Sequence, residues 1–140
     1  MGEVRVTVRL TSALDEMLHR RKQLSRSEVR TYEAEALVDT EAVRTVVPPA
    51  VVEKLGLEIR GQRVAEYADG RKDSVGITEP IVVDLLGRDT LDEALVPGDE
   101  VLIGQTVLEK LDLLVDRANR RLIPNPAHPD QPVTKVKRHR

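Results

Sequence analysis

The chain has 140 residues and a formal net charge of −2, which indicates one domain and no global field that would attract nucleic acid. It contains no cysteine, which excludes disulfides, thiolate metal sites and cysteine catalysis. Phe and Trp are absent and Tyr occurs twice, so the core must be aliphatic, and the many β-branched residues favour strands.

The first part of the chain mixes strand patterns with short helical ones. In chain order we expect a half-buried strand over residues 4–10, an excursion over 11–30 that is either a short helix or an Ω-like loop, strands over 32–38 and 43–47, and a helix over 50–55. Pro48-Pro49 suits the first turn of that helix, and Gly56 suits its end.

The second part reads as a series of short strands separated by turns. We expect a hairpin with strands 63–67 and 72–77 around Asp69-Gly70, strands over 81–86, 91–96 and 101–103, a helix over 105–111, and strands over 113–115 and 121–123. This pattern predicts a mostly β domain over residues 1–124, closed or sandwiched, with one or two short helices. Residues 125–140 are proline-rich and then basic, and we expect that tail to be mobile or ordered by a partner.

Several function classes are disfavoured by simple observations. The three histidines are scattered without metal-ligand spacing, so we expect no metal site and no cofactor. No apolar run reaches the length of a membrane span and the start does not resemble a signal peptide, from which we expect a soluble, cytoplasmic protein with no membrane partner. A nucleic-acid-binding barrel that uses the basic tail is disfavoured by the missing surface aromatics and the net negative charge.

One motif points to chemistry. Asp39 follows the apolar run Ala36-Leu37-Val38, where a buried strand ends, although an aspartate there most often only caps a loop. Further along come Thr45-Val46-Val47-Pro48, the helical segment, the glycine-tipped hairpin and, about 60 residues after Asp39, the sequence Val101-Leu102-Ile103-Gly104. In this order and spacing, residues 32–124 resemble the retropepsin-like aspartic proteases of clan AA, especially the small bacterial single-lobe members.

The resemblance implies a closed retropepsin-like β-barrel with a flap hairpin, and a role for each matching residue. Asp39 corresponds to the catalytic aspartate, in an active-site loop that continues through Thr40, Glu41 and Ala42. The threonine hydroxyl in this family bonds across a two-fold axis. The flap that closes over substrate corresponds to Tyr67, Ala68, Asp69, Gly70 and Arg71. Ile103 and Gly104 correspond to the strand behind the catalytic loop, where glycine lets two backbones approach closely.

Such chemistry requires two copies of the chain. Two carboxylates held about 3 Å apart share one proton, so one member activates water while the other donates to the oxyanion. The chain has a single Asp-Thr motif of this kind, so the second aspartate would be Asp39 of another copy. The resemblance therefore implies a homodimeric endopeptidase that acts on peptide or protein substrates.

Glu41 departs from the family pattern, which has glycine after Asp-Thr. We expect its side chain to crowd the loop and its backbone angle to be unfavourable. Two interpretations follow: a tuned or substrate-selective enzyme, or a catalytically impaired member that binds extended peptides by strand addition. A substitution that silences the enzyme would give the same pattern.

Overall fold

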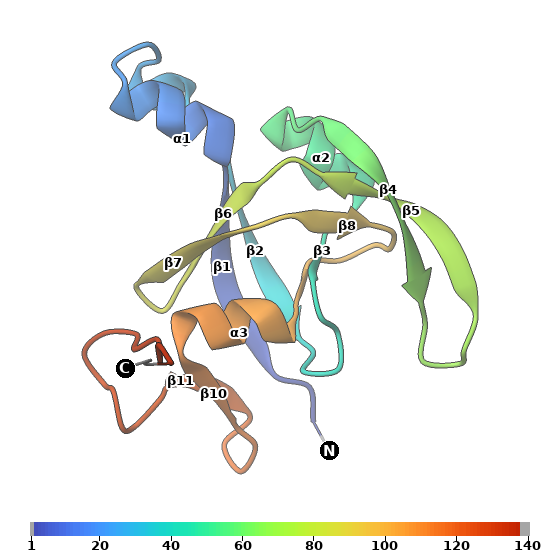
Figure 1. The fold of residues 1–140 in the computed structure, drawn as a ribbon, viewed down its shortest axis with the longest axis vertical. Helices are drawn as coiled ribbons and strands as arrows, with labels where there is room; N and C mark the ends of the chain where they lie inside the picture. The colour runs from blue at the N-terminus through green and yellow to red at the C-terminus, as the bar shows by residue number, and fades with distance from the viewer. Residues whose placement is uncertain (1, 138–140) are drawn as a thin grey trace.

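The computed structural model describes residues 2–137, which contain eleven strands, three α-helices and one 3-10 helix (Figure 1). The elements are β1 Arg5–Ser12, α1 Ala13–Arg20, η1 Arg26–Glu28, β2 Thr31–Val38, β3 Thr45–Val46, α2 Pro49–Leu55, β4 Ile59–Glu66, β5 Lys72–Thr78, β6 Ile81–Leu85, β7 Arg88–Asp92, β8 Ala94–Val96, β9 Leu102–Ile103, α3 Gln105–Leu111, β10 Leu113–Asp116 and β11 Arg121–Pro124. The expectation of a mostly β chain is confirmed. Three α-helices form rather than one or two, because the excursion over 11–30 contains α1.

The main sheet has nine strands in the order β4-β5-β8-β3-β9-β2-β1-β6-β7. Most neighbours run antiparallel, but β2 pairs parallel with β9, and β3 pairs parallel with β8. The expected closed barrel is not confirmed, since β4 and β7 lie at opposite ends of this order with no pairing between them in the described chain. A separate two-stranded sheet, β10-β11, lies beyond α3 at the end of the molecule where the N-terminus lies (Figure 1).

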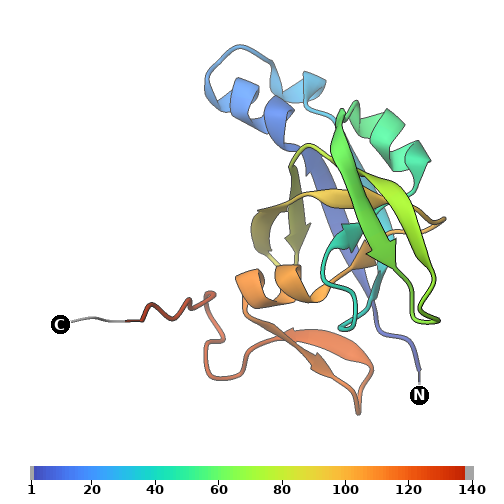
Figure 2. The same ribbon diagram turned by 45° about the vertical axis from the view of Figure 1, so that its right-hand side comes forward.

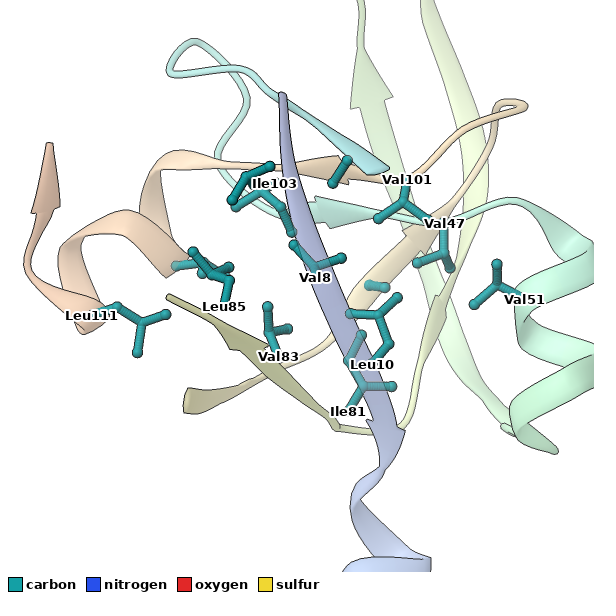
Figure 3. Close-up of a cluster of buried hydrophobic side chains, with 14 of the residues drawn as sticks. Val8, Leu10, Val47, Val51, Ile81, Val83, Leu85, Val101, Ile103 and Leu111 are labelled. Carbon is teal, nitrogen blue, oxygen red and sulfur yellow. The ribbon is translucent and has the colours of Figure 1, made fainter. Parts of the chain in front are cut away.

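The core is aliphatic and lies between the strands and the inner faces of α2 and α3 (Figure 3). Along β1 the side chains alternate, so that Val6, Val8 and Leu10 are buried while the residues between them are exposed. Val51 of α2 and Leu111 of α3 pack against the same cluster. None of the helices within residues 2–137 is long and apolar enough to cross a membrane.

Local signals end the helices where the sequence predicts. Pro49 lies in the first turn of α2, and Gly56 closes that helix in the left-handed region with φ 61°. Ser12 caps the N-terminus of helix α1, because its hydroxyl accepts from the backbone N–H of Asp15. The carboxylate of Asp15 then binds Arg30 across the excursion, with Nε at 2.8 Å and Nη2 at 2.9 Å, which ties the two ends of this segment together.

The first part of the C-terminal tail makes hydrogen bonds to the domain. The carboxylate of Asp112 accepts from the side chain of Asn125 at 3.0 Å and from the backbone N–H of Val133 at 3.1 Å, and lies 2.6 Å from Nδ1 of His128. The buried Arg88 donates to the carbonyl of His128 at 2.8 Å. The last three residues of the basic tail lie outside the described residues.

Candidate functional site

The loop that carries Asp39 is held between β2, β3 and β9. The backbone N–H of Asp39 donates to the carbonyl of Ile103 at 3.0 Å, which continues the parallel pairing of β2 with β9. On its other side β9 pairs antiparallel with β3, through Leu102 and Val46. Strand β9 therefore lies between the strand that enters the loop and the strand that leaves it.

Gly104, directly after β9, lies against the backbone of this loop. A Cβ built on Gly104 would lie 2.7 Å from the carbonyl oxygens of both Ala42 and Arg44, closer than real Cβ atoms come to such atoms. The start of α3 also binds the loop, since the N–H of Gln105 donates to Ala42 at 2.7 Å and that of Thr106 donates to Val43 at 3.1 Å. The loop is thus fixed by backbone contacts that only a residue without a side chain permits.

The Asp39 carboxylate is partly exposed and oriented by its own loop. Its Oδ1 accepts from the backbone N–H of Glu41 at 3.0 Å, and its carbonyl accepts from the N–H of Ala42 at 3.2 Å. Thr40 and Glu41 are exposed, and so is Val43, at 65 %. The surface around the carboxylate therefore combines polar groups with one exposed aliphatic side chain.

Glu41 fits this loop without backbone strain, contrary to our expectation. It is not among the residues with positive φ, and its N–H makes the bond to Asp39 described above. Its exposed side chain does not crowd the loop within the single chain. The backbone that glycine would provide is therefore compatible with glutamate, and any effect of Glu41 on function must come from its side chain.

The hairpin expected over residues 63–77 is present as β4-β5. Strand β4 begins at Ile59 instead of residue 63 and ends at Glu66, and β5 ends at Thr78. At its tip the N–H of Tyr67 donates to Arg71 at 2.8 Å, and Gly70 has φ 85°. The guanidinium of Arg71 lies 4.4 Å from the ring centre of Tyr67, beside the exposed Ala68 and Asp69. The hairpin tip and the loop after β2 point to the same end of the molecule in both views (Figures 1 and 2).

Two hollows of the described surface lie away from the Asp39 loop. A groove of about 420 Å³ runs between α1 and the β6-β7 hairpin, with Met17 and Leu91 among its lining residues. A second hollow of about 390 Å³ is lined by Gly2, Val4, Arg117 and Arg120. Neither is lined by Asp39 or by the hairpin tip. No group of three metal-ligating side chains occurs within residues 2–137.

Four charged residues near the loop were missed by the sequence analysis: Arg44, Arg60, Asp92 and Glu93. Asp92 is buried and accepts from both the N–H and the hydroxyl of Thr45, at 3.1 and 2.7 Å. The two adjacent carboxylates in Leu91-Asp92-Glu93-Ala94, inside a predicted strand, are the signal that could have indicated it. Its partner lies 47 positions away in the chain, which a local pattern does not reveal.

Comparisons with known proteins find a structural likeness but no relative by sequence. No family model matches the chain, and neither does any curated protein. Among solved structures, the chain is similar to the solution structure of the Simian Foamy Virus (mac) protease, with a TM-score of 0.46 and 16 % sequence identity. The likeness covers 74 % of this chain and 90 % of the viral one.

Proposed function

We propose that the chain is a retropepsin-like aspartic endopeptidase that works as a homodimer, with one Asp39 from each copy. The observation that carries the proposal is the close packing of the loop between β2 and β3 against Gly104, at the end of β9. This packing holds the partly exposed Asp39 in a loop of fixed backbone. A structural aspartate that only capped a loop would not need this support. The sequence motif and the hairpin that extends to the same end of the molecule agree with it.

In the proposed mechanism, the two Asp39 carboxylates meet at a two-fold axis and share one proton. The ionised carboxylate takes a proton from water, whose oxygen attacks the peptide carbonyl, and the protonated one donates to the developing oxyanion. The bond from the Glu41 N–H to Oδ1 orients each carboxylate during this exchange. Thr40, which is exposed in one chain, is available to brace the partner loop.

The substrate in this proposal is an extended peptide held between the loop and the β4-β5 hairpin. Strand β4 is an edge of the sheet, and its exposed face is available to an extended chain. Tyr67 and Arg71 at the tip would close over the peptide, and Gly70 permits the turn between them. A segment without secondary structure is the best substrate for such an arrangement, because its backbone is free to pair with an edge strand.

The test is cleavage of an unstructured protein such as casein, from roughly pH 4 to 7, with and without a statine-type inhibitor. We expect cleavage that the inhibitor blocks and that Asp39→Asn abolishes, with the far-UV circular dichroism unchanged. Asp130→Asn, at an exposed position of the tail, is the matched control and should cleave like the parent. Cleavage that survives Asp39→Asn would reject the catalytic assignment.

A second function is favoured by Glu41, which places an exposed carboxylate next to Asp39 in the loop. In that case the chain is a retropepsin-like protein with impaired catalysis, which binds extended peptides without cutting them. Fluorescence polarisation with a labelled statine-type peptide separates the two functions. Binding without cleavage by the parent, together with cleavage by Glu41→Gly, would identify the impaired member.

A further inference from the structure

We propose that Glu93 is a positioning residue that couples the base of the β4-β5 hairpin to the loop that carries Asp39. The role of Glu93 at an active site rests on the proposed function, whereas the coupling of the two segments does not. The inference concerns charged side chains from three segments that are distant in sequence: Arg44 at the end of the loop, Arg60 in β4, and Asp92-Glu93 at the end of β7.

Asp92 provides the fixed end of this arrangement. Its side chain has no exposed surface, and it accepts from the N–H of Thr45, the hydroxyl of Thr45 and the guanidinium of Arg44, the last at 3.3 Å. A buried carboxylate with three donors is held in one orientation. Because Thr45 is the first residue of β3, Asp92 fixes the point at which the loop rejoins the sheet.

Glu93 extends the arrangement to the hairpin. It is the single residue between β7, which pairs with β6, and β8, which pairs with β3 and β5. Its Oε2 lies 2.8 Å from Nη1 of Arg60, and its Oε1 lies 4.0 Å from Nη1 of Arg44. One carboxylate therefore lies between a guanidinium of the hairpin and a guanidinium at the end of the Asp39 loop.

Arg60 occupies an irregular position of its strand. Ile59 pairs with Thr78 and Gly61 pairs with Ile77, so Arg60 is the extra residue of a β-bulge. Bulges re-aim a side chain out of the regular alternation and are frequent beside active sites. The side chain of this bulge residue binds Glu93. One ion pair therefore joins the bulge in β4 to the junction between β7 and β8.

The location of these side chains indicates a local role rather than a contribution to overall stability. The side chains of Glu93, Arg44 and Arg60 are 26 %, 40 % and 53 % exposed. Ion pairs of this exposure contribute little to the stability of a whole domain. Their effect falls on the segments they join, which are the two segments that would hold a substrate.

The experiment is amide hydrogen exchange by mass spectrometry on the unliganded full chain and on Glu93→Gln. We expect exchange in residues 39–44 and 59–66 to rise about two- to fivefold, the range that loss of a partly exposed ion pair permits, while the thermal midpoint stays nearly unchanged. When Glu93 is already replaced by Gln, the further substitution Arg60→Gln should cause no additional rise in exchange. The matched control is Arg63→Gln, on the same strand, whose guanidinium donates to the Gln62 carbonyl; it should leave residues 39–44 as in the parent.

The outcomes separate this inference from the proposed function. If Glu93→Gln loosens the hairpin but leaves exchange in 39–44 unchanged, or changes neither, the coupling is wrong. If both segments loosen in a chain that cleaves nothing, the coupling holds and the proposed function fails. In a chain that cleaves, Glu93→Gln should raise KM several-fold with kcat nearly unchanged, whereas general loss of folded enzyme would lower kcat alone.

Discussion

Gly104 is the residue whose replacement tests the loop geometry most directly. A Cβ there would meet two carbonyl oxygens at 2.7 Å, and these belong to backbone that cannot rotate away as a side chain does. We expect Gly104→Ala to lower the free energy of unfolding by about 1–3 kcal/mol, as overpacking does, and to displace residues 42–44. Chemical denaturation measures the first effect and backbone NMR shifts the second.

Gly61→Ala is the control for that substitution. Gly61 also lies in the main sheet, in β4, but a Cβ there would meet only a methyl group of Ile77, at 3.8 Å. We expect a small change in the free energy of unfolding and unchanged shifts for 42–44. Equal effects of the two substitutions would mean that the close approach at Gly104 does not matter to the loop.

We propose that Glu41 acts through the charge of its side chain rather than through its backbone. Within the proposed dimer its side chain would lie in the same loop as Asp39, where its negative charge would oppose negative charge on the Asp39 pair. We expect Glu41→Gln to raise kcat/KM about three- to tenfold, the size of a partly screened interaction between nearby charges. Glu41→Gly should raise it at least as much, because it also removes a side chain beside the substrate. A fall in the activity of both variants would show that the Glu41 side chain contributes to catalysis.

At the scale of elements, the excursion that contains α1 and η1 depends on the pair of Asp15 with Arg30. Asp15 is buried, and the two bonds from the Arg30 guanidinium lower its pKa below the usual range, against the opposing effect of burial. A depressed pKa in the folded state stabilises the fold above the ordinary aspartate pKa, and that stabilisation is lost as the pH falls below it. The pair therefore makes stability depend on pH from about pH 4 downward.

Asp15→Asn tests this pair. We expect a loss of about 1.5–3 kcal/mol at neutral pH, the usual size for hydrogen bonds to a charged group, and a smaller further loss on acidification than in the parent. Urea titrations at several pH values measure both. Asp130→Asn, on the exposed tail, should follow the parent curve. A variant with the parent's acid sensitivity would show that other carboxylates dominate it.

For the whole molecule, the proposed dimer predicts where an interface lies. Val43 is 65 % exposed and lies in the same loop as Asp39, so a two-fold contact between the loops of two copies would cover it. We expect Val43→Asp to weaken dimerisation at least tenfold, because it places a charge in a desolvated contact. Sedimentation equilibrium measures the dissociation constant.

Leu86→Asp is the matched control for the interface. Leu86 is 45 % exposed and lies in the turn between β6 and β7, on another side of the molecule (Figure 1). We expect its dissociation constant to equal that of the parent. A parent that stays monomeric at tens of micromolar, or two variants with the same effect, would contradict an interface at the Asp39 loop.

Local signals in the sequence were sufficient for most elements of the fold. The alternation in residues 4–10, the glycine after α2 and the Asp-Gly tip of the hairpin act over a few residues, so they predict structure without knowledge of distant partners. Helix α3 was predicted with the bounds that the structure has. Asp39 and Gly104 were singled out by motifs about 60 residues apart and the family they resemble, and their roles stay predictions.

Tertiary structure decided what depends on partners far away in the chain. The expected strand over 91–96 is interrupted at Glu93, because its two halves pair with different neighbours, β6 on one side and β3 and β5 on the other. The choice of a helix in the excursion is supported by the bond that Arg30 donates to Asp15, 15 positions away. Likewise the open order of the sheet, and the meeting of Arg44, Arg60 and Glu93, come from long-range pairing, which no periodicity within one segment encodes.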